Sequence, residues 1–167
     1  MKIIGAGLLF LACALAGIWL GEQKKIGVAE CEAFLALLRH ARSRIDGFDA
    51  PTKQIWREFE NETLEKNGFL AALRSEENED VYFDAFSRAF EKTERSLHIS
   101  SETKKIIRSF GGAVGKSFSE DQLAMIDVCI SGMSDVFEKS KSEARRDMKL
   151  YITLGFSLGA VIFIMII

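Results

Sequence analysis

Residues 123–137 read LAMIDVCISGMSDVF, and this stretch decides the fold of the chain. Its apolar side chains recur in alternating steps of three and four residues, which is the spacing of a coiled-coil seam. Ser117 with Glu120, or Ser119 with Gln122, fits a capping box at the start of the same helix. The stretch therefore predicts a long amphipathic helix whose seam is formed by Leu123, Ile126, Ile130, Met133 and Phe137.

A second apolar stripe, nearer the start of the chain, predicts the partner of this helix. Its members keep one helical face. Gly47 is expected to end the helix, and a turn from Asp46 to Pro51 leads to the next element. We expect the two long helices to pack antiparallel and to form the core. The members of the stripe are Val28, Cys31, Phe34, Leu35, Leu38 and Ile45.

Shorter helices are expected between the two long ones, at Thr52–Phe59 and Glu62–Leu73. The acidic cluster Glu76–Asp80 suits the positive end of a helix dipole, so it is expected to open the next helix. Ser100 or Ser101 is expected to cap a further helix. The apolar faces of these last two helices are predicted to carry Phe83, Phe86, Ala89 and Phe90, and then Ile106, Ile107 and Phe110.

Both ends of the chain are uncharged and apolar over eighteen residues, at Ile3–Leu20 and Leu150–Ile167. Eighteen helical residues span about 27 Å, close to the roughly 30 Å hydrocarbon core of a bilayer. The sequence therefore predicts an all-α fold, a helical bundle domain at 22–149 flanked by transmembrane helices at 1–21 and 150–167. Each end has an alternative: a cleaved signal peptide for the first run, and a buried core helix for the second.

The signal-peptide alternative depends on the Ala14-Leu15-Ala16 segment, which resembles a cleavage site. Because apolar residues continue beyond it through Leu20, we favour a retained anchor. Basic residues follow the first run and precede the second, so the positive-inside rule places the domain between them in the cytoplasm. The residues that flank the runs are Lys24 and Lys25, then Arg145, Arg146 and Lys149, with Trp19 and Tyr151 expected at the interface.

Glycines inside the two apolar runs have the G-x-x-x-G spacing that permits close helix approach in lipid. One pair is Gly17 with Gly21, and the other is Gly155 with Gly159. Each pair could pack against the other run or against a neighbouring subunit. The alternative is that these glycines reflect only the abundance of glycine in membrane helices.

No stretch of the sequence assembles an active site. Residues 111–117 read GGAVGKS and end like a phosphate-binding loop, but Phe110 stands where that motif needs a glycine. We interpret them as a glycine-rich break between two helices. His40, expected on the polar side of its helix, and His98 lack metal-ligand spacing, and the cysteines are unpaired. We therefore predict no catalytic residue, cofactor or metal.

The charge balance of the chain argues against nucleic acid as a partner. The segment Glu22–Lys149 holds 24 acidic and 21 basic side chains, a net charge of −3. Such a balance provides no positive field for nucleic acid, so none is expected as a partner.

The chain resembles the stage III sporulation protein AB family. That family has a glycine-rich turn of the form L-G-x-x-L-G-x-S-D followed by a glutamine, and residues 110–118 here read FGGAVGKSF. Phe118 replaces the aspartate, Phe110 and Val114 replace leucines, and Phe86 stands where a tryptophan is common. The residues that match the turn, the glutamine and the entry to the membrane run are Gly111, Gly112, Gly115, Ser117, Gln122, Tyr151, Leu154, Gly155 and Gly159.

The resemblance implies a non-enzymatic membrane component of the secretion-like channel complex between mother cell and forespore. Its cytoplasmic domain, on the mother-cell side, would be similar to the helical domains of type II secretion and type IV pilus platform proteins. The implied partners are a hexameric secretion-type ATPase and other sporulation channel proteins, and a homo-oligomer is a further possible assembly. We expect the contact surface on the polar faces of the two long helices and around the Gly111–Gly115 turn.

Two other functions fit parts of the sequence. One is an extracytoplasmic helical binding module with a cleaved signal peptide and a C-terminal anchor. The other is a platform component of a general secretion or pilus system. The side of the membrane on which the domain lies separates the first of these from the sporulation hypothesis.

Overall fold

The structure is a computed structural model of the chain, and it describes residues 2–48, 52–76, 82–114 and 120–166. Within these residues it contains seven helices and no strand, which confirms the all-α prediction. The chain divides into two compact units. We call Met1–Val28 with Lys139–Ile167 the paired-helix unit, and Ala29–Glu138 the helical unit. The long helices α1 (Lys2–Phe48) and α7 (Glu120–Ile166) contribute to both.

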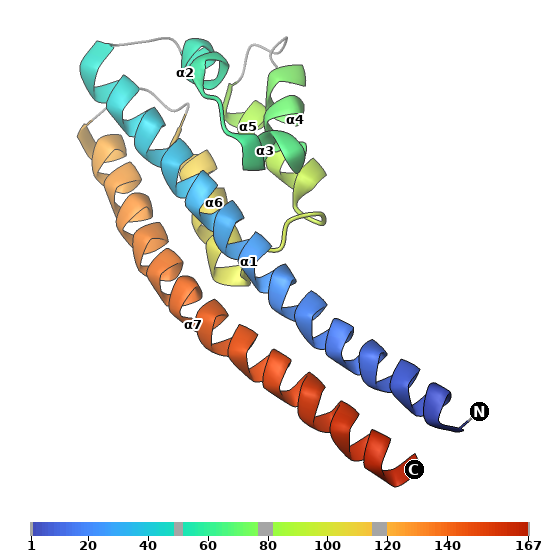
Figure 1. Cartoon of the computed structure of the whole chain (residues 1–167). Coiled ribbons are helices and arrows are strands. Elements are labelled where there is room, and N and C mark those ends of the chain that lie inside the picture. Colours follow the sequence, from blue (N-terminus) through green and yellow to red (C-terminus); the bar gives the residue numbers. More distant parts are fainter. Residues whose placement is uncertain (1, 49–51, 77–81, 115–119, 167) are drawn as a thin grey trace. The chain divides into compact units, whose positions relative to one another are not determined.

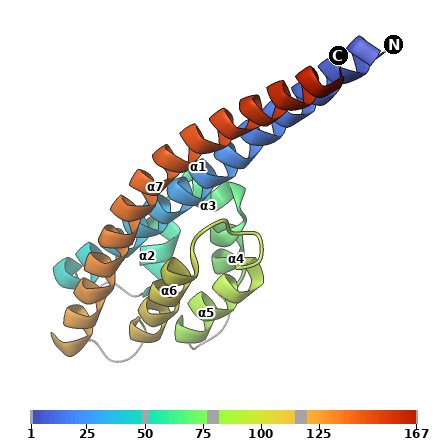
Figure 2. The same cartoon turned by 90° about the horizontal axis from the view of Figure 1, so that it is seen from below.

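In the paired-helix unit, the first part of α1 and the last part of α7 lie side by side and antiparallel (Figures 1 and 2). The rings of Phe10 and Phe156 meet edge to face with centroids 5.8 Å apart. Lys24 Nζ lies 3.8 Å from Asp147 Oδ2. No helix among the described residues combines the length and apolarity required of a membrane-crossing segment. The transmembrane helices predicted at 1–21 and 150–167 stay a prediction.

The core of the helical unit forms around α1. Phe34 is fully buried, and its ring packs against Phe69 of α4 (Phe69–Ser75) at 4.9 Å and Phe90 of α5 (Tyr82–Thr93) at 6.1 Å. One turn earlier on α1, Cys31 Sγ lies 3.8 Å from Met133 Sδ of α7. The middle of the predicted apolar stripe therefore forms the core, since Cys31, Phe34, Leu35 and Leu38 are buried, whereas Val28 and Ile45 at its ends are half-buried.

The antiparallel pairing of the two long helices is confirmed inside the helical unit. Cys31 contacts Met133, whereas Arg42, further along α1, bonds Asp127, which comes earlier in α7. The Arg42 Nε and Nη2 atoms donate to the two carboxylate oxygens at 2.8 and 3.2 Å. The seam faces inward: Ile126, Met133 and Phe137 are buried, and Leu123 and Ile130 are half-buried.

The helix predicted at Glu62–Leu73 is wrong, because the chain forms α3 (Glu62–Lys66) and α4 in its place. Gly68 separates them with a φ of +83°, a left-handed conformation that glycine adopts without steric cost. The Asn67 side chain then accepts a hydrogen bond from the Phe69 N–H at 3.1 Å, which helps α4 to start. Asn61 caps α3 by accepting from the Thr63 and Leu64 amides.

The remaining helices begin close to the expected positions. Helix α2 is Thr52–Glu58, and α6 is Ser101–Ala113. Ser100 is the N-cap of α6, and its Oγ accepts from the Thr103 N–H at 3.1 Å, as predicted. The expected caps of α7 at Ser117 and Ser119, like the turn at 49–51, lie outside the described residues.

Candidate functional site

The glycine-rich segment of α6 is packed helix rather than a break. Gly111 and Gly112 lie within α6, which continues to Ala113, so the predicted break is wrong at these two positions. A Cβ on Gly111 would lie 2.8 Å from Cδ1 of Phe86 and 3.4 Å from Oγ of Ser87. Glycine at 111 thus lets α6 approach α5 closely, and its role is packing.

Phe86 cannot yield to a larger side chain because aromatic rings surround it. Its ring centroid lies 5.6 Å from that of Trp56, 5.5 Å from Phe69 and 5.5 Å from Phe110. These neighbours come from α2, α4 and α6, and all are buried. The rings meet at tilted or edge-to-face angles, the geometry that aromatic pairs favour. This aromatic cluster fixes the place of α6 in the helical unit.

The four glycines of the two G-x-x-x-G pairs lie at the contact between the two helices of the paired-helix unit. A Cβ on Gly17 would lie 2.6 Å from the carbonyl oxygen of Tyr151, and one on Gly155 would lie 2.9 Å from that of Cys13. A Cβ on Gly159 would lie 2.8 Å from the ring of Phe10. Gly17 and Gly155 therefore face each other, and the helix backbones approach too closely for any side chain at either position. The other member of each pair meets a side chain instead: Gly21 lies against Met148, and Gly159 lies against Phe10.

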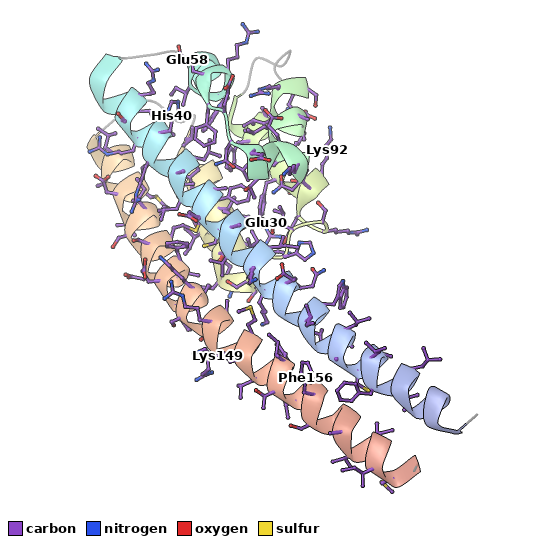
Figure 3. The ribbon with its side chains drawn as sticks, viewed as in Figure 1. Glu30, His40, Glu58, Lys92, Lys149 and Phe156 are labelled. Atoms are coloured by element: carbon purple, nitrogen blue, oxygen red, sulfur yellow. The ribbon has the colours of Figure 1, made fainter. Side chains whose placement is uncertain are left out.

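One buried polar group of α1, Glu30, was not predicted from the sequence. Glu30, labelled in Figure 3, is buried and accepts a hydrogen bond from the His98 backbone N–H at 2.6 Å. The His98 Nδ1 atom lies 3.7 Å from Glu30 Oε1. Glu30 thereby fixes the segment between α5 and α6 to α1. The sequence did contain a signal for this buried carboxylate, because Glu30 stands between Val28 and Cys31 of the apolar stripe.

The sequence predicted His40 on the polar side of α1, and this prediction is wrong. Its ring packs against Phe59 with centroids 5.3 Å apart. Its Nε2 is buried and has no hydrogen-bond partner among the described residues. Within the same residues, no group of three or more histidine, cysteine or acidic side chains is placed to hold a metal.

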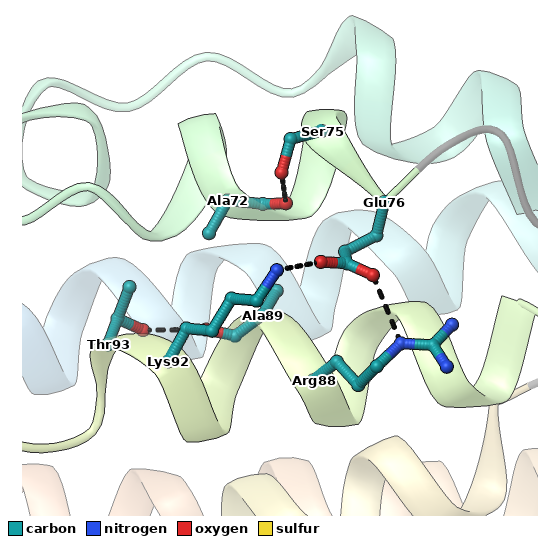
Figure 4. A network of polar contacts seen from close by, with 7 residues as sticks. All are labelled: Ala72, Ser75, Glu76, Arg88, Ala89, Lys92 and Thr93. Carbon is teal, nitrogen blue, oxygen red and sulfur yellow. Dashed lines mark hydrogen bonds and ion pairs between the residues drawn. The ribbon is translucent and has the colours of Figure 1, made fainter.

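Glu76 begins the acidic cluster but is not the start of a helix. It is the C-cap of α4, and its carboxylate accepts hydrogen bonds from Lys92 and from Arg88 Nε, the latter at 3.0 Å (Figure 4). The prediction that this cluster opens a helix is therefore wrong for Glu76, and residues 77–80 lie outside the described part of the chain. Glu76 connects the end of α4 to two successive turns of α5.

A family model described as stage III sporulation protein AB matches residues 2–167. The chain belongs to the stage III sporulation protein AB family. Membership assigns it a role in sporulation. Comparison with curated proteins and with solved structures finds no match to the chain.

The structure separates the residues that carried the resemblance to this sporulation family into two places. Gly111 and Gly112 belong to the packed end of α6, whereas Tyr151, Gly155 and Gly159 lie in the paired-helix unit. Gln122 is in the first turn of α7, but its side chain is outside the described part. Gly115 and Ser117 lie outside it as well.

The ion pairs of Glu76 make the stability of this sporulation protein depend on pH. The hydrogen bond from Lys92 lowers the pKa of Glu76 below that of a free glutamate. A lowered folded-state pKa stabilises the protein above the unfolded pKa, and this contribution is lost as pH falls through the folded pKa. We expect Glu76→Gln to lower the urea midpoint at pH 7, and we expect its difference from wild type to be smaller at pH 3. An equal difference at both values would contradict this assignment.

Two of the three free thiols are protected by the fold. Burial raises the pKa of Cys31 and of Cys129, so the reactive thiolate is disfavoured at neutral pH. We expect maleimide to modify both only after denaturation, at least about a hundredfold more slowly in the native protein. Mass spectrometry of the labelled peptides gives the rates, with Ser109→Cys on the exposed face of α6 as the control. Rapid native labelling would show that the core around α1 opens readily.

Proposed function

We propose that the protein is a non-enzymatic membrane component of the secretion-like channel complex between mother cell and forespore. In this role it couples a cytoplasmic secretion-type ATPase to the membrane assembly. The single observation that carries the proposal is the family match, which spans residues 2–167. The matched family is described as a sporulation protein rather than by an enzymatic activity.

The paired-helix unit supports a location in the membrane. Its two helices pack through glycines, while many large apolar side chains of both helices are exposed. A lipid bilayer would cover the exposed apolar side chains of both helices at once. The exposed side chains are Leu8, Leu9, Leu11, Leu15, Ile18, Trp19 and Leu20 of α1, and Leu150, Leu154, Phe156, Leu158, Val161, Ile164 and Met165 of α7.

The helical unit offers a surface for the ATPase on α7. Val128 and Met125 are 71% and 51% exposed, although both are apolar. Exposed Ser131 and Asp135 lie further along the same helix. Apolar side chains on an otherwise polar face are typical of a contact with another protein. This surface lies on the polar face of a long helix, where the sequence led us to expect the contact.

A pulldown tests the ATPase contact. The full-length chain, solubilised in mild detergent, is used to capture the secretion-type ATPase of the same organism. We expect Val128→Glu with Asp135→Lys to reduce capture at least about tenfold, because a buried unpaired charge opposes association. The control is Glu91→Lys on the exposed side of α5. If wild-type chain captured no ATPase, the coupling role would be wrong, and unchanged capture by the double variant would exclude this surface.

Topology distinguishes the proposal from the extracytoplasmic alternative. Because Cys31 and Cys129 are buried, their labelling reports unfolding of the domain rather than the side of the membrane on which the domain lies. A Ser109→Cys variant with Cys13→Ala places a reactive thiol on the exposed face of α6. We expect a membrane-impermeant maleimide to modify it only after the cell membrane is opened. Labelling in intact cells would favour a binding module outside the cell.

A further inference from the structure

Charge is distributed unequally between the two units. The paired-helix unit contains eight basic and three acidic residues, whereas the helical unit contains fourteen basic and twenty-one acidic residues. The overall net charge of −2 conceals this separation. The positive unit also contains most of the exposed large apolar side chains.

Five basic residues of the paired-helix unit form what we call the basic collar. They are all exposed: Lys24, Lys25, Arg145, Arg146 and Lys149. The ion pair between Lys24 and Asp147 places the α1 and α7 segments at the same level of the helix pair. A Cβ on Gly21 would also lie 3.7 Å from Cβ of Met148, which agrees with that register.

Acidic neighbours neutralise only part of the collar. Lys25 Nζ lies 2.7 Å from Glu22 Oε1, and Asp147 is shared between Lys24 at 3.8 Å and Arg146 at 4.0 Å. Arg145 and Lys149 form no ion pair with any residue that the structure describes, and Lys149 points away from α1 (Figure 3). Positive charge therefore remains available to an external anion.

The collar borders the apolar surface on both helices. Trp19 and Leu20 precede Lys24 on α1, and Leu150 and Leu154 follow Lys149 on α7, and all four are exposed. Cations next to an apolar surface that begins with tryptophan match the order of chemistry across one leaflet, from headgroup to acyl chain. Juxtamembrane clusters of this size attract anionic lipids.

We propose that the basic collar binds the headgroups of anionic phospholipids. Arg145 and Arg146 can each donate two parallel hydrogen bonds to a phosphate, whereas the lysines contribute point charges. A zwitterionic lipid offers the same phosphate, but its own ammonium group cancels the attraction. This inference rests on the membrane location proposed above, and it adds the class of lipid and the residues that bind it.

Quenching of tryptophan fluorescence tests the proposal in the full-length chain. The protein is reconstituted in nanodiscs of phosphatidylglycerol and phosphatidylcholine, with brominated acyl chains on one lipid at a time. Trp19 is 62% exposed beside the collar, whereas Trp56 is buried between Phe86 and Phe110 and provides an unquenched background. We expect brominated phosphatidylglycerol to be enriched about threefold around Trp19.

Variants and salt identify the cause of that enrichment. Replacing the five collar residues with glutamine should abolish the preference, whereas Arg95→Gln with Lys105→Gln in the helical unit should leave it unchanged. Raising the salt from about 50 to about 500 mM should reduce the preference in wild type, because added ions screen exposed charges.

Equal quenching by the two lipids in wild type would overturn the collar proposal and leave the membrane location intact. Quenching by neither lipid would overturn both. A preference that survived in the glutamine variant would show that the collar is not its source.

Discussion

Replacing Gly111 with leucine is expected to destabilise the helical unit by about 3 kcal/mol, the upper end of the usual cost of overpacking. Its Cβ would lie 2.8 Å from Cδ1 of Phe86, and the ring cannot rotate away because Trp56, Phe69 and Phe110 enclose it. Urea unfolding of the full-length chain in detergent, followed by Trp56 fluorescence in a Trp19→Phe background, measures the loss. Trp56 touches Phe86 directly, so its emission reports on this site.

Gly132 provides the matched control, since it is also a glycine inside a helix. A Cβ there would meet only Ile106 Cδ1 at 3.6 Å, which is an ordinary contact. Gly132→Ala should therefore stabilise the protein by up to about 1 kcal/mol, the difference in helix propensity between the two residues. If Gly111→Leu were as mild as Gly132→Ala, the close packing of α6 on α5 would be wrong.

The helices that were predicted correctly are those whose signal is periodic and long. The apolar seam residues from Leu123 to Phe137 recur over several turns, so a single helix places all of them on one face. The cap of α6 was equally clear, because the Ser100 hydroxyl competes well for the first amides of a helix. Local sequence carries both kinds of information.

The errors involve residues whose role depends on distant parts of the chain. Gly111 resembles a helix break until the ring of Phe86, 25 positions earlier, is placed against it. Glu76 resembles a helix start, but its carboxylate bonds Lys92 on another helix. Tertiary contacts decide the roles of these two residues, and a single sequence does not show which distant residues come into contact.

Gly68 is an error of a different kind, because its signal was local and was present in the sequence. Asn67 followed by Gly68 is a frequent turn dipeptide, and here it separates α3 from α4. The prediction of a single helix over 62–73 did not take this dipeptide into account, and the left-handed φ of Gly68 shows that the turn signal was correct.

The second large effect is expected in the paired-helix unit, where Gly155→Leu should separate α1 from α7. Its Cβ would lie 2.9 Å from the carbonyl oxygen of Cys13 and 3.5 Å from Cα of Gly17. Both are backbone atoms, which cannot move aside as a side chain can. The close contact then forms only if the helices shift, at a cost of about 1–3 kcal/mol.

An engineered disulfide measures this separation. A Cβ on Gly21 lies 3.7 Å from Cβ of Met148, within the roughly 3.5–4.5 Å range that disulfides require. The Gly21→Cys, Met148→Cys pair in a Cys13→Ala background should therefore crosslink rapidly under mild oxidation, while the buried Cys31 and Cys129 stay reduced. Adding Gly155→Leu should slow the crosslink about tenfold, which corresponds to about 1.4 kcal/mol.

Gly5 supplies the control, because a Cβ at that position would have nothing within 4 Å. Gly5→Leu makes the same change on α1 and should leave the rate of crosslinking unchanged. A slower crosslink with Gly5→Leu as well would mean that leucine perturbs the unit in general rather than at the glycine contact. A fast crosslink with Gly155→Leu would show that the two helices do not depend on this contact. The facing glycines would then not be what holds α1 to α7.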